Sequence, residues 1–411
     1  MGLGLVDTYA LLVLILCFGM FHLSGGVLNF FNPAALFFVF HLALLGISSW
    51  YRGLYEGRVW VSDEVVFIVY TSLLLYSAGA LATAAILSRR GVLLDLPRLQ
   101  ASAPTIELQR MGRLIMLLIP LALAAGYSLH IGGLVWLQEE GIDDLRVELR
   151  KGSGWVALLG IAVAFVGTVM LLCSRHVGSW LRGCLTILLL GGCAVSYGNR
   201  APGADVLVAG LFSLWVMKYR KVPLLGLVGC AGLLIVLVAV AGLYRQGFEI
   251  SSQGVMQQIL WRPFVNFQNF QILYDAFPSQ ISFQMGNGYL IDLSVIMPGY
   301  QPNYSTWLKD ALEMEFTGGG LNQTYLGELY SNFSLLPALL GSFILGAMLQ
   351  LLYGLMGMLR SSLQLMLIMS FSLKSIVSSG LVSPLIYMLA PYLLVYCSYR
   401  LLLGRLFHEK T

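Results

Sequence analysis

Two arginines, four residues apart in the segment LRVELRKGSG, have the spacing of a two-pronged anion-binding site. On a helix, Arg146 and Arg150 share one face, where their like charges repel each other by roughly 0.2–0.5 kcal/mol. A guanidinium binds phosphate oxygens through paired, charge-assisted hydrogen bonds, so two of them on one face suit a phosphate-bearing ligand. The alternative is a solvated amphipathic turn in which the arginines pair with Glu140, Asp143 or Glu148.

Other bases stand where a positive charge is costly unless it is solvated or paired. Arg200 is the single base in the turn SYGNRAPGAD, which predicts either a phosphate contact or an ion pair with Asp205. Lys374 lies in SFSLKSIVSSG, within the apolar segment 363–379, about 11 residues from the expected cytoplasmic end and so roughly 16 Å deep at 1.5 Å per residue. It is either a functional residue or a lysine that snorkels or pairs. Two further anion-binding candidates are Arg245 and Arg262.

Carboxylates, amides and aromatic side chains concentrate in one long polar stretch, residues 244–332. This stretch holds seven acidic residues against three basic ones. Side chains that combine a flat apolar face with a hydrogen-bonding group suit sugar rings, although they also suit any interfacial loop. The candidate sugar-contact residues are Tyr300, Asn303, Tyr304, Trp307, Asn322 and Tyr330.

Within this stretch the sequence predicts a helix over 263–277, which Pro263 would begin because proline suits a first helical turn. One face is aromatic and the other largely polar, with Phe264, Phe267, Phe270, Tyr274 and Phe277 set against Asn266, Asn269 and Asp275. Such a pattern suits a helix lying along a membrane interface. It also suits a helix packed onto a bundle, and both arrangements stay open.

The scaffold for these residues is predicted to be an all-α, polytopic integral membrane protein. Of the 411 residues, 58% are hydrophobic and only 11% are charged, whereas about 25% are charged in a soluble domain. Apolar runs of about 20 residues indicate transmembrane helices, of which we expect eleven or twelve. The first is expected to be retained and not removed as a signal peptide. Eleven are placed at 8–24, 33–50, 64–88, 112–131, 155–174, 183–197, 203–218, 223–243, 333–357, 363–379 and 382–402.

The charges between these segments predict an orientation, because basic connections stay on the cytoplasmic side. One side collects 14 Lys and Arg with 3 acids, and the other collects 9 Lys and Arg with 17 acids. The N-terminus and the long polar stretch are then outside. Three parts follow: an N-terminal bundle over 1–243, a long outer loop with amphipathic helices over 244–332 that roofs an active site, and C-terminal helices with a short cytoplasmic tail over 333–411.

Several classes of site have no signature in the sequence. The six cysteines show neither CxxC nor Cys/His spacing, which argues against a disulfide framework and a zinc site. The acidic pairs Asp63–Glu64 and Asp143–Asp144 suit solvated loops better than a metal site. No nucleotide-binding loop, nucleic-acid signature or internal repeat is visible, so no metal, cofactor or nucleic acid is expected.

The layout resembles a family, the bacterial oligosaccharide repeat-unit polymerases of the Wzy type, which include O-antigen and enterobacterial common antigen polymerases. The similarity covers most of 130–360 and lies in the order of short, degenerate motifs: LRVELRKGSG, SYGNRAPGADVLVAGLFSLWV, AGLYRQG, and GNGYLIDLSVIMPGYQPN followed by LNQTYLGELYSNF. One departure concerns topology. Many members have twelve or more spans with both ends inside, whereas eleven are placed here.

The resemblance implies a metal-independent glycosyltransferase of the bacterial inner membrane, acting at the periplasmic face. Such enzymes transfer a growing glycan from undecaprenyl pyrophosphate to the next lipid-linked repeat unit. By position, the arginines that the family uses in its outer loops match Arg146 or Arg150, Arg200 and Arg245. The implied partners are lipid-linked glycans, membrane lipids, and the chain-length regulator and flippase of the same pathway.

This reaction needs positive charge where the pyrophosphate leaves, and a base for the acceptor hydroxyl. No histidine lies in the outer loops, so a carboxylate is the expected base. Glu328, in the motif GELY, is the first choice, and Asp292 and Glu315 are the second. The alternative for Glu328 is an acid that stabilises a helix N-terminus.

Three other functions compete with the polymerase. A ligase moves a finished glycan to a lipid acceptor, but it should carry a histidine beside the arginines of the long loop. A transporter or flippase favours ionisable groups at mid-membrane and repeated halves, and only Lys374 fits. A metal-dependent enzyme would keep its acidic pair in an outer loop that follows the first span.

Overall fold

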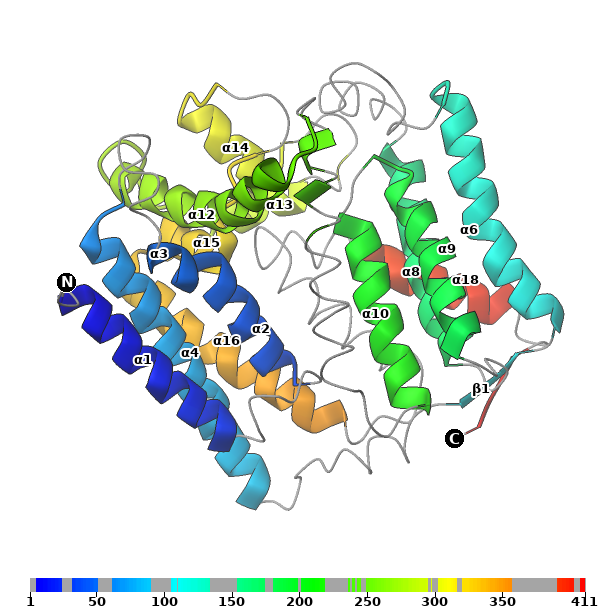
Figure 1. Ribbon diagram of the computed structural model, residues 1–411, viewed down its shortest axis with the longest axis horizontal. Coiled ribbons are helices and arrows are strands. Elements are labelled where there is room, and N and C mark those ends of the chain that lie inside the picture. The colour runs from blue at the N-terminus through cyan, green and yellow to red at the C-terminus, as the bar shows by residue number, and fades with distance from the viewer. Residues whose placement is uncertain are drawn as a thin grey trace. The chain divides into compact units, whose positions relative to one another are not determined.

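Most predicted apolar segments that the structure describes are helical, and their bounds agree to within a few residues (Figure 1). The computed structural model describes residues 5–23, 32–50, 61–89, 105–108, 110–133, 154–173, 180–198, 201–218, 236, 239–240, 242–244, 249–294, 297, 302–315, 320–356, 390–402 and 407–410. The predicted segment 363–379 and most of 223–243 lie outside these residues, so the number of spans stays a prediction.

Five of the described helices are long and apolar enough to cross a membrane. They are Leu5–Leu23, Asp63–Arg89, Arg110–His130, Gly154–Leu172 and Leu335–Gly354, and two shorter apolar helices cover Phe37–Trp50 and Leu181–Val195. Length and composition therefore make the chain a helical membrane protein. These helices confirm the all-α expectation, and the described residues add one pair of four-residue strands. Strand β1 (Thr105–Leu108) pairs antiparallel with β2 (Phe407–Lys410), with Thr105 opposite Lys410.

The chain folds into two compact units, each assembled from distant segments. The first unit contains Met1–Leu93, Leu260–Leu355 and Ser375–Ile386, and the second contains Leu94–Ile259, Met356–Lys374 and Tyr387–Thr411. The three-part division expected from the sequence follows position along the chain and stays a prediction.

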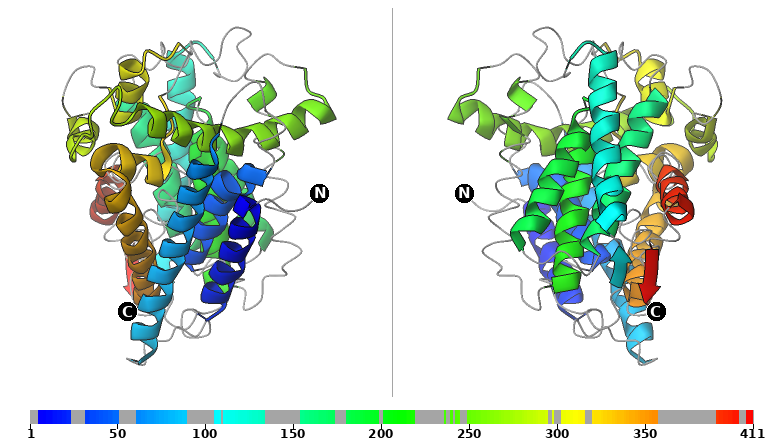
Figure 2. Two further views of the ribbon diagram at one scale, coloured as in Figure 1. Left: turned by 90° about the vertical axis from the view of Figure 1, so that its left-hand side faces the viewer. Right: turned by 90° about the vertical axis from the view of Figure 1, so that its right-hand side faces the viewer.

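The first unit has a bundle and a helical layer. The bundle helices are α1 (Leu5–Leu23), α2 (Pro33–His41) with its continuation through η1 (Leu42–Gly46) and α3 (Ile47–Trp50), α4 (Asp63–Arg89) and α16 (Leu335–Met356). The helical layer is α12 (Ser252–Ala276, in this unit from Leu260), α13 (Asn287–Ser294), α14 (Tyr304–Ala311) and α15 (Thr324–Phe333). In Figures 1 and 2 this layer lies across one end of the bundle, with α12 crossing the direction of α4.

Helices α1 and α4 run in the same direction. Near the start of both, the Tyr9 hydroxyl lies 2.8 Å from the Thr71 hydroxyl, and its ring stacks on Phe67 with centroids 4.4 Å apart. Further along, Phe21 meets Tyr76 with centroids 6.3 Å apart. Residue numbers therefore rise together along the two helices, and both begin at the end that the helical layer covers.

Helix α16 contacts α4 backbone to backbone through two glycines. A Cβ at Gly79 would overlap the carbonyl oxygen of Phe343, and a Cβ at Gly346 would overlap that of Tyr76. Small residues allow such close approach in membrane helix pairs, where lipid provides no hydrophobic drive for association.

A buried amide joins α2 to α16. The Asn32 side chain accepts a hydrogen bond from the Ala34 N–H at 2.9 Å, which caps α2, and donates one to Gln350 Oε1 at 2.9 Å. One side chain thus satisfies a helix end and provides a polar contact inside the bundle.

The second unit contains α6 (Arg110–His130), α8 (Gly154–Leu172), α9 (Trp180–Val195), α10 (Ala201–Lys218) and α18 (Ala390–Leu402). Helix α8 is buried along most of its length and packs on the other four. Phe165 stacks on Tyr392 of α18 with centroids 4.3 Å apart, and Leu172, Ile187 and Leu214 form a buried core between α8, α9 and α10. A helix surrounded in this way is apolar on all faces, as its sequence shows.

Candidate active site: a buried carboxyl cluster

Helix α15 is short, polar and almost wholly buried. It carries Glu328 at 0% exposure, together with buried Ser331 and Asn332. Both ends have backbone in the left-handed region, with φ of 55° at Thr324 and 77° at Ser334. Neither residue is glycine, and a β-branched residue such as threonine rarely adopts this conformation. Such strain persists where the surrounding structure holds it in place, and it is concentrated at functional sites.

Helix α15 lies between α12 and the bundle. Its Gly327 packs so closely on α12 that a Cβ there would come within 2.8 Å of Leu273. On the bundle side, the Tyr325 hydroxyl lies 3.3 Å from the Ser72 hydroxyl of α4, and its ring meets His41 edge-on with centroids 4.8 Å apart. The helix therefore connects the layer to the bundle.

Helices α13 and α14 cover the polar side of α15. The Gly288 N–H donates to Asn332 Oδ1 at 3.1 Å, and the Tyr304 hydroxyl donates to Ser331 Oγ at 2.9 Å. A Cβ at Gly288 would lie 2.8 Å from both Asn332 and Tyr304. Glycine therefore lets α13 approach both neighbouring helices.

The carboxyl group of Asp292 is part of this contact. It is 1% exposed, and its Oδ1 accepts a hydrogen bond from the Tyr304 N–H at 2.8 Å. Its Oδ2 is buried and makes no hydrogen bond among the described residues. Burial raises the pKa of Asp292 above its ordinary value, although the bond from Tyr304 opposes the rise. A raised pKa makes the ionised carboxylate a stronger base.

The charge of Glu328 affects the pKa of the same two phenols, Tyr289 and Tyr304, as the charge of Asp292 does. Burial raises the pKa of Tyr289, and the charges of Glu328 and Asp292 raise it further. The pKa of Tyr304 is also raised by burial and by both carboxyl charges, with the hydrogen bond to Ser331 opposing the rise. Together with the hydrogen bonds from Tyr304 to Asp292 and to Ser331 and the burial of both acids, these effects group Glu328, Asp292, Tyr289 and Tyr304, which we call the carboxyl cluster.

The other predicted base, Glu315, has a different environment. It is exposed, four residues after the end of α14. It takes no part in the buried contact between α13, α14 and α15 that holds Asp292. Of the three candidates, the structure thus buries Glu328 and Asp292 together and leaves Glu315 in contact with solvent.

The predicted sugar-contact residues have mainly internal partners. Tyr304 is fully buried, and the Tyr330 hydroxyl donates to the Phe277 carbonyl at 2.9 Å. Asn303 caps α14 by accepting the Thr306 N–H at 2.8 Å. The Asn322 side chain donates to Asn266 Oδ1 at 2.8 Å, and the Asn322 backbone carbonyl accepts from the Asn269 side chain at 3.0 Å. Trp307 stacks on Tyr304 and is half-buried, and Tyr300 lies outside the described residues.

The structure describes the side chain of none of the predicted anion-binding residues. Arg262 lies in α12, but its side chain is not described. The others lie outside the described residues: Arg146, Arg150, Arg200, Arg245 and Lys374. Their contact with a phosphate therefore stays a prediction.

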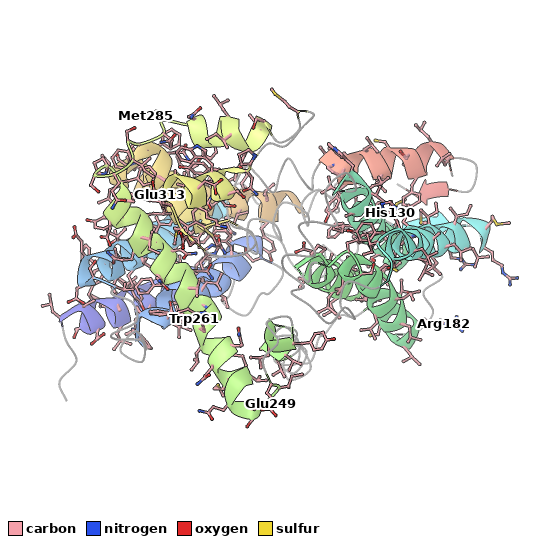
Figure 3. All side chains as sticks on the ribbon, turned by 90° about the horizontal axis from the view of Figure 1, so that it is seen from above. His130, Arg182, Glu249, Trp261, Met285 and Glu313 are labelled. Atoms are coloured by element: carbon pink, nitrogen blue, oxygen red, sulfur yellow. The ribbon has the colours of Figure 1, made fainter. Side chains whose placement is uncertain are left out.

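The aromatic helix needs one correction, and the structure decides between the two arrangements left open for its aromatic face. It begins at Ser252, so Pro263 lies inside α12 and not at its start (Figure 3). Its phenylalanines at 264, 267, 270 and 277 are at most 2% exposed, so the aromatic stripe packs within the protein and does not face a membrane interface. Asn266 and Asn269 are also buried, because α15 covers the polar side.

The structure adds residues that the sequence interpretation missed. Tyr289 and Asn332 belong to the carboxyl cluster or its hydrogen bonds. The spacing of Gly288 and Asp292, four residues apart, could have indicated a shared buried helix face. A second missed contact holds the layer to α4, where the Tyr274 hydroxyl donates to Glu64.

No protein-family model matches the chain, and no curated protein and no solved structure matches it either.

Proposed function

We propose that the protein is a polymerase of the bacterial inner membrane that joins undecaprenyl-pyrophosphate-linked oligosaccharide repeat units at the periplasmic face. The observation that carries the proposal is the carboxyl cluster. Glu328 and Asp292, two of the bases predicted from the sequence, come from separate helices and are both buried where α13, α14 and α15 meet. The Tyr304 N–H donates to Asp292, and the Tyr304 hydroxyl donates to Ser331 on the helix of Glu328. The cluster belongs to the helical layer at one end of an apolar bundle, where a lipid-linked substrate would meet it.

The cluster provides the proton acceptor that the reaction needs. The acceptor hydroxyl oxygen bonds to the anomeric carbon, the bond from that carbon to the phosphate oxygen breaks, and undecaprenyl pyrophosphate leaves as an anion. The hydroxyl proton passes to a carboxylate. Because Glu328 and Asp292 are buried and Tyr289 is partly exposed, Tyr289 is the member that the acceptor reaches first.

Two structural facts agree with the predicted alternation of spans. Helices α1, α4 and α16 all begin at the end covered by the layer, as the first, third and ninth predicted spans must if the layer and the N-terminus share one side. The strands β1 and β2 pair two segments that the charge distribution assigns to the same, cytoplasmic side.

A lipid-linked oligosaccharide flippase is the second candidate, and one observation favours it. The bundle of the first unit contains polar groups and an irregular helix, namely the Asn32–Gln350 hydrogen bond, buried His41, and the π-helical segment η1 directly after it. Polar groups and broken helices inside a bundle are typical of transport pathways.

Deleting the gene and separating the cell-surface glycan on a gel tests the proposal. A polymerase mutant retains one repeat unit on the lipid core and loses the ladder. A flippase mutant loses the single repeat as well, and a ligase mutant accumulates polymer on the lipid carrier. Arg245→Ala is expected to reproduce the single-repeat pattern in a folded protein. Normal long polymer from the deletion strain contradicts the proposal.

A further inference from the structure

One helix of the layer has an apolar face that the rest of the protein does not cover. On α13, Leu290 is 62% exposed and Leu293 is 43% exposed, while Met285 before the helix and Met297 after it are 76% and 62% exposed. Leu290 and Leu293 are three residues apart on α13 and share one face of the helix, and Met285 and Met297 flank that helix. We call these four residues the apolar stripe.

The opposite face of α13 is the one that packs inside the protein. Gly288 contacts α14 and α15, and Asp292 receives the hydrogen bond from Tyr304. The helix is therefore amphipathic in an unusual way, because its buried side carries the charge and its exposed side carries the hydrocarbon. An exposed face of this kind indicates a partner that is itself apolar.

The sequence around α13 is suited to lipid. From residue 276 to residue 303, Asp292 is the single charged residue, and its carboxyl group is buried. Charged residues resume beyond this stretch, with Lys309, Asp310 and Glu313 in and after α14. A helix without exposed charge contacts hydrocarbon without the cost of desolvating an ion.

The position of α13 also matches a lipid boundary. It belongs to the layer at the end of the bundle where α4 and α16 begin, and a membrane that these helices cross must have one surface near that end. Figure 3 shows Met285 at the outer edge of the first unit, not over its centre. Met285, which flanks α13 and belongs to the stripe, therefore lies at the edge of this unit, where lipid can reach it.

We propose that the apolar stripe docks α13 into the hydrocarbon boundary of the lipid leaflet at the end of the bundle that the helical layer covers, which is the outer leaflet in the proposed orientation, so that α13 is an interfacial helix. Eight residues at 1.5 Å each give a helix about 12 Å long, lying along the surface without crossing the bilayer. Interfacial helices bury their apolar face about 5–10 Å below the headgroups. Lipid contact on one face of α13 then fixes the depth of Asp292 on the other.

Site-directed spin labelling of the full chain in lipid vesicles tests this inference. A nitroxide is attached to cysteine at position 290 or 293, in a chain whose exposed Cys397 is replaced by serine. Oxygen concentrates in hydrocarbon, whereas a charged-ligand nickel complex stays in water. The two labels should show an oxygen-to-nickel accessibility ratio several-fold above that of a label at Asp310, which is exposed on α14.

Two reference positions make the outcome decisive. A label at Ile344, exposed near the middle of the apolar helix α16, gives the ratio for the hydrocarbon core, and positions 290 and 293 should lie between it and Asp310. A ratio equal to that of Asp310 places the stripe in water and overturns the proposal. Low accessibility to both reagents shows that a second copy or another protein covers the stripe, which also overturns it. The measurement requires no turnover, so its result is independent of the proposed polymerase activity.

Discussion

The carboxyl group of Asp292 is held where its ionisation is unfavourable, and this predicts a pH-dependent stability. Because burial raises its pKa above the ordinary 3.8, the folded protein binds this proton more tightly than the unfolded chain does. The protonated carboxyl group of Asp292 contributes its full stabilisation when the pH is below the ordinary pKa. This contribution is lost as the pH rises through the raised pKa of the folded state. Asp292→Asn cannot ionise but can still accept the Tyr304 N–H.

The variant should therefore gain thermal stability relative to the wild type as the pH increases from about 4 to about 7. Thermal denaturation of the purified protein in detergent at several pH values measures this gain. Asp310→Asn, at an exposed site on the same layer, serves as the control and should run parallel to the wild type. If Asp292→Asn also runs parallel to the wild type, the carboxyl group does not have a raised pKa.

Glu328 carries the second prediction at this scale. Glu328→Gln keeps the volume of the buried side chain and removes its basic carboxylate. If Glu328 is the base, the polymerisation rate in vesicles with lipid-linked repeat units should fall by about 10²–10⁴-fold, the range for general acid–base catalysis. Asp310→Asn should polymerise at the wild-type rate. Loss of activity in Glu315→Gln instead of Glu328→Gln would assign the role to the exposed acid.

At the scale of elements, the packing of α4 on α16 depends on the absence of two side chains. Gly79→Ala introduces a Cβ that overlaps the Phe343 carbonyl oxygen, so the helices must separate and the apparent melting temperature should fall by several degrees. Gly19→Ala on α1 is the matched control, since nothing lies within 4 Å of its Cβ. Alanine favours a helix over glycine by about 1 kcal/mol, so this control should be neutral or stabilising.

Size-exclusion chromatography after heating measures both variants in detergent. Equal melting temperatures for the two would show that α4 and α16 do not approach through their backbones. The same comparison can be made with Gly346→Ala, which meets the Tyr76 carbonyl oxygen from the other helix.

Apolar segments and their bounds could be predicted from the sequence, but what covers each face could not. The phenylalanine stripe at 264, 267, 270 and 277 and the leucine pair at 290 and 293 are both apolar at helical spacing. The first is buried against protein and the second is exposed. Lipid and a protein core are both hydrocarbon, so periodicity does not distinguish between them. Only the tertiary contacts of α12 and α13 determine which apolar face is covered by protein and which is exposed.

The candidate site shows the same division between local and long-range information. Residue type selects Glu328, Asp292 and Glu315 as possible bases. Their burial depends on how α13, α14 and α15 pack, and no local pattern encodes that packing. The capping role of Asn303 was readable in principle, because asparagine before a helix commonly accepts an N–H of its first turn. The strands β1 and β2 were missed because two four-residue segments so distant in sequence pair only in the folded chain.

For the whole molecule, the decisive quantity is the side of the membrane on which the helical layer lies. Within the first unit, the layer covers the start of α4, where the Ser62 N–H donates to Gln271 Oε1 at 2.8 Å. Helix α4 has 27 residues, so its other end lies about 40 Å away at 1.5 Å per residue. This length exceeds the hydrocarbon core, so the two ends of α4 belong on opposite sides of a membrane.

Cysteine labelling with a membrane-impermeant maleimide in spheroplasts, which expose the outer face of the inner membrane, tests this orientation. Glu313→Cys, exposed just beyond α14, should react in intact spheroplasts, whereas Ser88→Cys, exposed at the far end of α4, should react only after permeabilisation. The unsubstituted chain sets the background from its own cysteines. The opposite pattern would put the carboxyl cluster in the cytosol, where the periplasmic polymerase proposal fails. Labelling of both sites in intact spheroplasts would show that α4 does not cross the bilayer.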